Sequence, residues 1–166
     1  LINLNYSLDR EIIRTNRSGT YTSTTIIGCN TRKYHGLLVV PQPHIDTQNH
    51  VFLSTVHEAV IQHGASFNLG INKYPGNYSP RGHKYIKDFD SEPIPRLTYR
   101  VGGVVLQKEI ILDTNRDRVM IRYTLLDAHS PTKLRISPFF AFRSFHALSK
   151  ENTDVNKDYE VVPNGA

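Results

Sequence analysis

Polar side chains that could contact a ligand gather at the edges of two apolar runs. Arg32, Tyr34 and His35 lie just before one run, and Arg143 and His146 follow another. A guanidinium donates a planar fork of hydrogen bonds, and an imidazole donates or accepts near neutral pH. Such residues can hold either sugar hydroxyls or the carboxylates of a partner domain. The sequence therefore predicts contact residues at both places and leaves both partners open.

A third candidate segment, residues 71–84, places tyrosines among amides and cations. Flat aromatic faces beside hydrogen-bond donors and acceptors are what a sugar-binding surface requires. Two prolines and two glycines interrupt any apolar periodicity here, which predicts a long exposed loop. Its candidate ligand contacts are Asn72, Tyr74 and Arg81. Tyrosines that merely pack on their own domain are the alternative interpretation.

The sequence does not contain a recognisable set of catalytic residues for bond cleavage. Glycosidases need two carboxylates about 5 to 10 Å apart, and one sequence does not show which carboxylates meet. Glu58 and Glu109 lie in apolar strand-like runs, where an outward-facing position is expected. His57 and His63 lack the spacing of a zinc-binding helix, and Cys29 is expected to be a buried, unreactive side chain. We predict no catalytic residue, no cofactor and no metal site.

Composition indicates one globular domain. The 166 residues are 39% hydrophobic and 21% charged, enough to form a single apolar core. No apolar run approaches the roughly 18 to 20 residues that span a bilayer, so no membrane partner is expected. The single cysteine and the lack of a leader pattern predict a cytoplasmic location. The net charge of +5 permits polyanion binding, although the basic residues are scattered along the chain.

The elements that must position these side chains are expected to be strands. Clusters of β-branched and aromatic residues alternate with turn formers, and Gly102-Gly103 supplies the positive φ of a two-residue hairpin. One short helix is predicted at residues 143–152. Strands joined by tight turns predict an all-β fold, an antiparallel two-sheet β-sandwich with little helix. The predicted extended segments are residues 21–27, 35–40, 51–62, 67–69, 96–101, 104–112, 118–126, 133–142 and 159–162.

The segment from Thr15 to Val40, with the run NTRKYHGLLVV at residues 30–40, resembles the opening of bacterial and archaeal glycogen debranching enzymes. Ile12 and Leu97 stand where that family usually has an aromatic residue, and Ser18-Gly19-Thr20 replaces a glycine-richer turn. The resemblance covers about residues 11–152 and continues through residues 72–76, 79–82, 99–108, 121–123 and 138–143.

This resemblance implies a glycoside hydrolase parent, an amylo-α-1,6-glucosidase, in which a β-domain precedes a helical (α/α)6 barrel. The barrel of such enzymes carries the acidic residues that hydrolyse α-1,6 branch linkages. Residues 1–166 are then expected to be a single β-sandwich domain, an incomplete N-terminal portion of a longer chain whose C-terminal barrel is absent. Its expected partners are an α-glucan such as glycogen and that barrel, and its expected role is non-catalytic.

Two other functions are alternatives. A nucleic-acid-binding β-domain is suggested by the charge of +5 and by arginine and tyrosine interleaved at Tyr99, Arg100, Arg122 and Tyr123. Its affinity would fall steeply with salt, and nucleic acid is not the partner we expect. A purely structural domain that braces the barrel without touching sugar is the other alternative.

Overall fold

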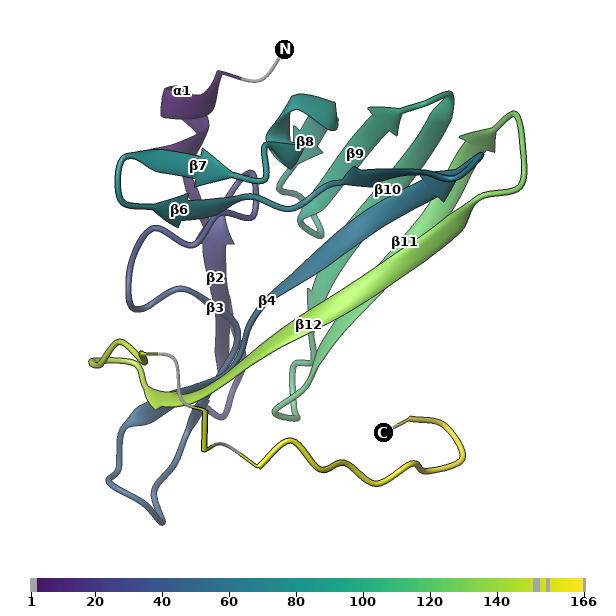
Figure 1. Cartoon of the computed structure of the whole chain (residues 1–166). Coiled ribbons are helices and arrows are strands. Elements are labelled where there is room, and N and C mark those ends of the chain that lie inside the picture. The colour runs from purple at the N-terminus through teal and green to yellow at the C-terminus, as the bar shows by residue number, and fades with distance from the viewer. Residues whose placement is uncertain (1–2, 151–152, 155, 166) are drawn as a thin grey trace.

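The computed structural model describes residues 3–150, 153–154 and 156–165, and these form mainly β-strands. Figure 1 shows their arrangement. In chain order the elements are α1 (Leu4–Leu8), β1 (Glu11–Thr15), β2 (Tyr21–Thr25), β3 (Gly36–Pro41), β4 (Asn49–Gln62), β5 (Ala65–Asn68), β6 (Asn72–Tyr74), β7 (Asn77–Ser79), the 3₁₀ helix η1 (Gly82–Tyr85), β8 (Ile86–Asp90), β9 (Arg96–Val101), β10 (Val104–Leu112), β11 (Val119–Ala128) and β12 (Lys133–Ser144).

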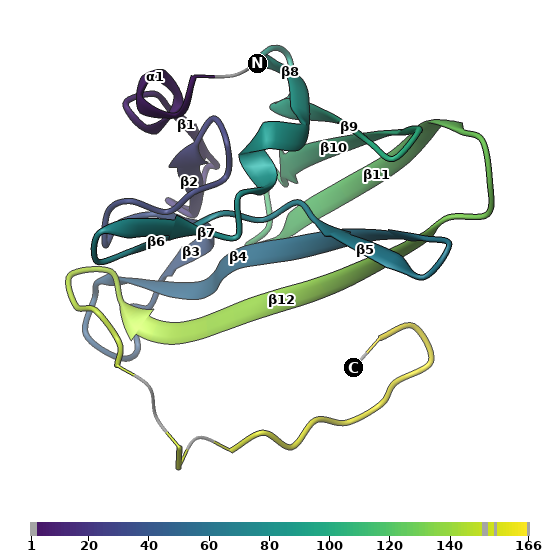
Figure 2. The same cartoon turned by 45° about the horizontal axis from the view of Figure 1, so that its top comes forward.

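Two antiparallel sheets form the body of the domain. The first has the order β1-β2-β3-β4-β12, with β5 also paired to β4, and the second has the order β11-β10-β9-β8. Figure 2 shows β4, β5 and β12 in one layer and β9, β10 and β11 in the other. A small third sheet pairs β6 with β7. The predicted all-β, antiparallel two-sheet fold is therefore confirmed.

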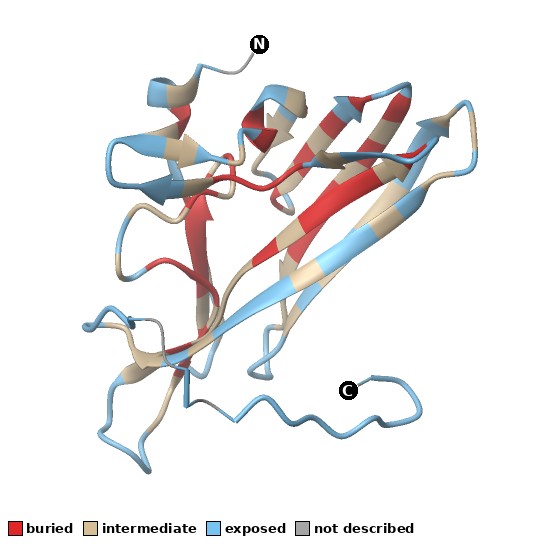
Figure 3. Ribbon diagram, viewed as in Figure 1, coloured by how far each residue is buried: buried red, intermediate tan, exposed pale blue. Residues whose placement is uncertain are grey.

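The core lies between the two sheets because alternate residues of each strand point inward. Leu97, Tyr99 and Val101 of β9 and Leu106 of β10 pack in one cluster with Val60 of β4. Figure 3 shows buried residues running along β4, β9 and β10. Within the described ranges, no helix is long and apolar enough to cross a membrane.

Two short hairpins join neighbouring strands, and the one predicted at Gly102-Gly103 is confirmed. His63-Gly64 joins β4 to β5 with φ angles of 47° and 76°, and Gly102-Gly103 joins β9 to β10 with φ angles of 57° and 79°. Two successive positive φ angles match the twist of the flanking strands, which is why short hairpins favour them. β2 and β3 also pair as antiparallel neighbours.

Residues 71–84 are not one long exposed loop, so that prediction is wrong. They form the β6–β7 hairpin, with Lys73 opposite Tyr78, followed by η1. Gly82 donates its backbone N–H to the carbonyl of Gly70 at 2.9 Å, which fixes η1 against the body. Strands of three polar residues carry too little apolar alternation to be recognised in a sequence.

The prediction of a helix at residues 143–152 is also wrong for residues 143–150, which the structure describes. Arg143 and Ser144 are the last residues of β12, and Ala147 then closes a turn by donating to the carbonyl of Ser144 at 3.1 Å. Residues 151–152 lie outside the described residues. The predicted extended segment 159–162 belongs to no named strand and makes an isolated bridge between Val162 and Gly165.

A charged pair lies inside the sandwich, contrary to the expectation that Glu58 faces outward. Glu58 is 3% exposed, and its Oε1 lies 2.7 Å from Nζ of Lys108, whose side chain is 8% exposed. The Tyr123 hydroxyl donates to the same oxygen at 2.5 Å. Burial, with the charge of Glu58, raises the pKa of Tyr123 and keeps its hydroxyl protonated. The buried carboxylate thus has a cation and a hydroxyl as partners.

Glu109 does lie on the outer face of its sheet, as expected, although its neighbours cover it. Arg122 donates to its two carboxylate oxygens at 2.5 and 2.9 Å. These hydrogen bonds lower the pKa of Glu109, since they favour the ionised form. Glu109 is therefore one half of an ion pair on the sheet surface.

Candidate functional site

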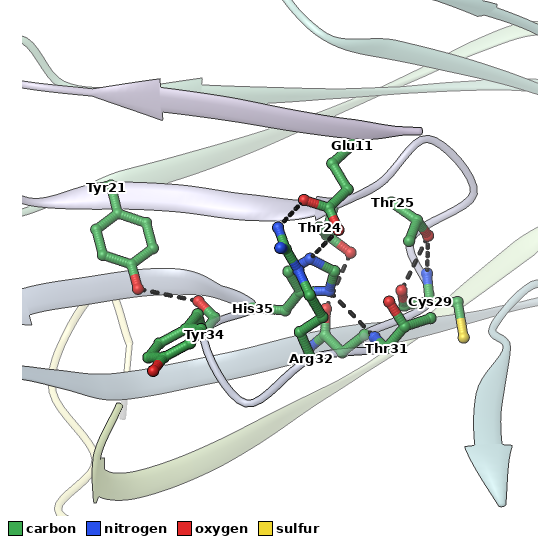
Figure 4. A network of polar contacts seen from close by, with 10 residues as sticks. Glu11, Tyr21, Thr24, Thr25, Cys29, Thr31, Arg32, Tyr34 and His35 are labelled. Atoms are coloured by element: carbon green, nitrogen blue, oxygen red, sulfur yellow. Dashed lines mark hydrogen bonds and ion pairs between the residues drawn. The ribbon is translucent and has the colours of Figure 1, made fainter. Parts of the chain in front are cut away.

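The loop at residues 30–35 is folded around the buried side chain of His35. Nδ1 of His35 accepts a hydrogen bond from the Thr31 N–H at 3.1 Å, and the side chain is fully buried. Nε2 lies 3.1 Å from Oε1 of Glu11 but without the alignment of a hydrogen bond. Arg32 pairs with the other carboxylate oxygen of Glu11 (Figure 4). His35 therefore connects this loop to β1, and Arg32 is partly neutralised.

These contacts determine the protonation of His35. Because Nδ1 accepts a hydrogen bond, the ring proton must lie on Nε2, which faces Glu11. Burial lowers the pKa of His35, and the nearby charge of Glu11 opposes that shift. His35 is therefore neutral at pH 7 and holds the loop in place. It is a positioning residue with a fully buried side chain.

We expect the domain to lose stability as the pH falls below about 6.5, the ordinary histidine pKa. Below that pH the unfolded chain binds a proton that folded His35 does not, so acid favours unfolding. His35→Asn keeps an acceptor for the Thr31 N–H but cannot titrate. Urea unfolding at pH 7.5 and 5.5 should show a smaller acid loss for this variant than for the parent chain.

The control for this titration is His44→Asn, at an exposed position, which should keep the full acid loss. Part of the loss should persist even in His35→Asn, because burial also lowers the pKa of His83. Equal acid losses for His35→Asn and the parent chain would contradict the assignment.

The structure brings the two predicted polar clusters together. Arg143 donates to the carbonyl of Lys33 at 2.8 Å across 110 residues of sequence, and to the carbonyl of Ala147 at 2.8 Å. The Tyr34 hydroxyl lies 3.3 Å from Nδ1 of His146, and the two rings meet edge to face. The end of β12 and the 30–35 loop therefore form a single site.

A groove of about 1440 Å³ lies along this loop and the end of β12. Of the predicted contact residues, Arg32, His35 and Arg143 line it, while Tyr34 and His146 pack beside it. The lining residues are Asn30, Thr31, Arg32, Lys33, His35, Ser54, Lys73, Pro138, Phe139, Phe140, Ala141, Phe142, Arg143, Leu148, Ser149, Lys150, Asn156, Lys157, Asp158 and Tyr159.

Sequence reasoning did not identify the aromatic surface of this groove. Phe140 and Phe142 are 63% and 64% exposed, and their rings stack with 5.8 Å between centroids and 9° between planes. Phe139 packs on His57 at 4.5 Å. A β-bulge between Phe140 and Arg143, where Phe142 has a φ of 49°, turns the pair outward. The only signal in the sequence was the run PFFAF at residues 138–142.

The candidates in residues 71–84 lie mostly outside the groove. Oδ1 of Asn72 is 3.1 Å from Nε2 of His57, so this amide secures the β6–β7 hairpin to β4. Tyr74 is 53% exposed and is not a lining residue of the groove. Arg81 lines a separate hollow of about 250 Å³ with Tyr78. Lys73 alone of this segment reaches the groove.

Cys29 is buried, as predicted. Its side chain is inaccessible, and burial raises the pKa of the thiol to about 11. A protonated, enclosed thiol is a poor nucleophile. Among the described residues, no group of three or more histidine, cysteine, aspartate or glutamate side chains is arranged to hold a metal ion.

The surface proposed for nucleic acid is not formed. Tyr99 is 3% exposed, and Tyr123 reaches inward to Glu58, whereas Arg100 is exposed and Arg122 pairs with Glu109. Successive strand residues point to opposite faces of a sheet, so tyrosine and arginine at adjacent positions separate. The interleaving seen in the sequence therefore does not place rings and cations on one face.

Comparison with known proteins places this chain by its sequence. A family model described as "Glycogen debranching enzyme N terminal" matches residues 10–165. No curated protein and no solved structure matches. The matched range includes the 30–35 loop, β12 and the β6–β7 hairpin, so the elements that line the groove lie within it.

Proposed function

Because the chain belongs to the family of glycogen debranching enzyme N-terminal domains, we propose that it binds α-glucan and docks against the catalytic barrel of such an enzyme. In this proposal it performs no bond cleavage. The groove is the proposed glucan site, and the exposed edge formed by β11 and β12 is the proposed docking surface.

The observation that carries the glucan proposal is the stacked, exposed pair Phe140 and Phe142 in the groove. The apolar faces of sugar rings pack on flat aromatic side chains. Polar side chains of Thr31 and Ser54 line the same groove, so hydrogen-bonding groups lie beside the aromatic surface. Ligand sites commonly combine an apolar surface with a few polar groups in this way.

The docking proposal rests on apolar side chains exposed at the two edge strands, β11 and β12. Leu125 and Leu126 are 53% and 52% exposed, and Ile136 is 49% exposed. Figure 3 shows little burial along β12 compared with β4 beside it. Long edge strands with apolar residues are normally covered, because they otherwise invite aggregation. A second domain of the same polypeptide is a suitable cover.

The non-catalytic part of the proposal rests on the carboxylates. Glycosidases use two carboxyl groups that flank the scissile bond. Among the described residues that line the groove, Asp158 carries the one carboxylate. Glu58 is enclosed between the sheets with Lys108, away from the groove lining.

The test of the glucan site is calorimetric titration of the chain with maltoheptaose. Phe140→Ala/Phe142→Ala should weaken binding by about fivefold to 150-fold, because two lost aromatic contacts of about 0.5 to 1.5 kcal/mol each sum to about 1 to 3 kcal/mol. Tyr74→Ala, an exposed aromatic outside the groove, should leave affinity unchanged. Undiminished affinity in the double variant would move the site elsewhere. Failure of the parent chain to bind any glucan would favour a purely structural role.

A further inference from the structure

We propose that the groove selects α-glucans that carry phosphate monoesters over neutral α-glucans, an inference that rests on the proposed glucan site. The observation behind it is the charge of the groove. Six cations and one carboxylate line it: Arg32, Lys33, Lys73, Arg143, Lys150, Lys157 and Asp158.

Among the residues that the structure describes, no carboxylate compensates the charge of three of these cations. Arg32 is paired with Glu11, but Lys33, Lys73 and Arg143 form no salt bridge with any carboxylate of the described residues. The hydrogen bonds of Arg143 go to backbone carbonyls, which fix the guanidinium without neutralising it. Nζ of Lys33 lies 5.1 Å from the centroid of the Tyr34 ring. The groove therefore presents positive charge that no carboxylate of the described residues balances.

Hydrogen-bond chemistry points to the same ligand. Ammonium and guanidinium groups only donate, whereas a sugar hydroxyl both donates and accepts. A neutral glucan would therefore need hydrogen-bond acceptors as well. One polar side chain of the groove, Asn30, already has its hydrogen bonds within the protein. Oδ1 of Asn30 accepts from the Thr24 hydroxyl at 2.9 Å, and its amide nitrogen donates to the carbonyl of Ser54 at 2.9 Å. Phosphate oxygens need only donors, and charged donors form the stronger bonds.

The cations come from separate elements that meet around one aromatic surface. Lys33 lies in the 30–35 loop, Arg143 at the end of β12, and Lys73 in β6. The β6 strand is held there by the contact of Asn72 with His57, whose ring packs on Phe139. A glucan stacked on Phe140 and Phe142 would thus have cations around the same groove to receive a phosphate.

The experiment compares maltoheptaose with maltoheptaose carrying one 6-phosphate monoester, by calorimetry of the whole chain at 50 and 500 mM NaCl. The phosphorylated sugar should bind at least tenfold more tightly at low salt, and within twofold of the neutral sugar at high salt, where ions screen the charges. Lys33→Gln/Lys73→Gln should abolish the preference, so that the two sugars bind within twofold of each other at low salt. Lys87→Gln, an exposed lysine of β8 outside the groove, should keep the preference.

The remaining outcomes separate this inference from the function on which it rests. If both sugars bind equally at low salt, the phosphate preference is wrong and the glucan site stands. If neither binds, the glucan site itself fails. Affinity for an oligonucleotide equal to that for the phosphorylated sugar would show a general polyanion surface and would overturn the selectivity. Unfolding midpoints of all variants within 2 °C of the parent would confirm that they are folded.

Discussion

Replacing Lys108 with methionine should lower the free energy of unfolding by about 3 to 5 kcal/mol. The reason is the carboxylate that remains. Glu58 would stay buried between the sheets without the ammonium group that lies 2.7 Å from its Oε1. An unpaired charge in a low-dielectric interior is much more costly than a missing contact. Urea denaturation followed by circular dichroism measures the loss.

A combined variant separates this cause from simple loss of packing. Lys108→Met together with Glu58→Leu and Tyr123→Phe removes all the polar partners at once, and replacing a buried ion pair by apolar groups is often neutral. Most of the stability should therefore return. Lys87→Met, at an exposed position of β8, serves as the control and should change little. A loss below 1 kcal/mol for Lys108→Met alone would show that water reaches the pair.

Substituting alanine for Gly82 is expected to destabilise the domain by at least about 2 kcal/mol, because the added methyl group has no room. A Cβ at this position would lie 2.1 Å from the carbonyl carbon and the carbonyl oxygen of Leu69, and 2.6 Å from the oxygen of Gly70. Backbone atoms cannot turn aside as a flexible side chain can. The strand-to-η1 contact, including the hydrogen bond from the Gly82 N–H, must break instead.

The matched control is Lys84→Ala, which alters an exposed side chain in the same 3₁₀ helix. It should leave the urea midpoint nearly unchanged. Equal midpoints for Gly82→Ala and Lys84→Ala would mean that η1 does not pack on Leu69 in solution. This steric limit also gives a physical reason for glycine in the Ser79-Pro80-Arg81-Gly82 segment of the family resemblance.

The sequence predicted most of the sandwich because its long strands carry their own signal. β4, β9, β10, β11 and β12 combine β-branched and aromatic residues with period-2 alternation, and glycines mark the hairpins. The short strands β1, β6, β7 and β8 were missed. They have five or fewer residues, and their pairing depends on partners that a local pattern does not contain.

The sequence predicted several residues of the site but not which of them lie together in space. Arg143 and Lys33 meet across 110 positions, which no local spacing indicates. His35 was proposed as a contact residue and is instead enclosed, since Glu11 of the missed strand β1 faces its ring. Glu58 shows the opposite error. It was expected to face outward and is instead buried in line with Val56 and Val60, because its partner Lys108 comes from the other sheet and only the packing of the sheets brings the two together.

The bulge in β12 has a consequence for how relatives of this chain can diverge. Phe140 lies opposite Leu53 and Arg143 lies opposite Val51. An advance of three residues along β12 therefore matches an advance of two residues along β4. Loss of one residue here would restore even pairing and remove the bulge that turns Phe140 and Phe142 outward. Chain length between these positions is therefore under stronger constraint than residue identity. Gene lineages should accumulate insertions and deletions at the exposed 43–48 tip and avoid them here.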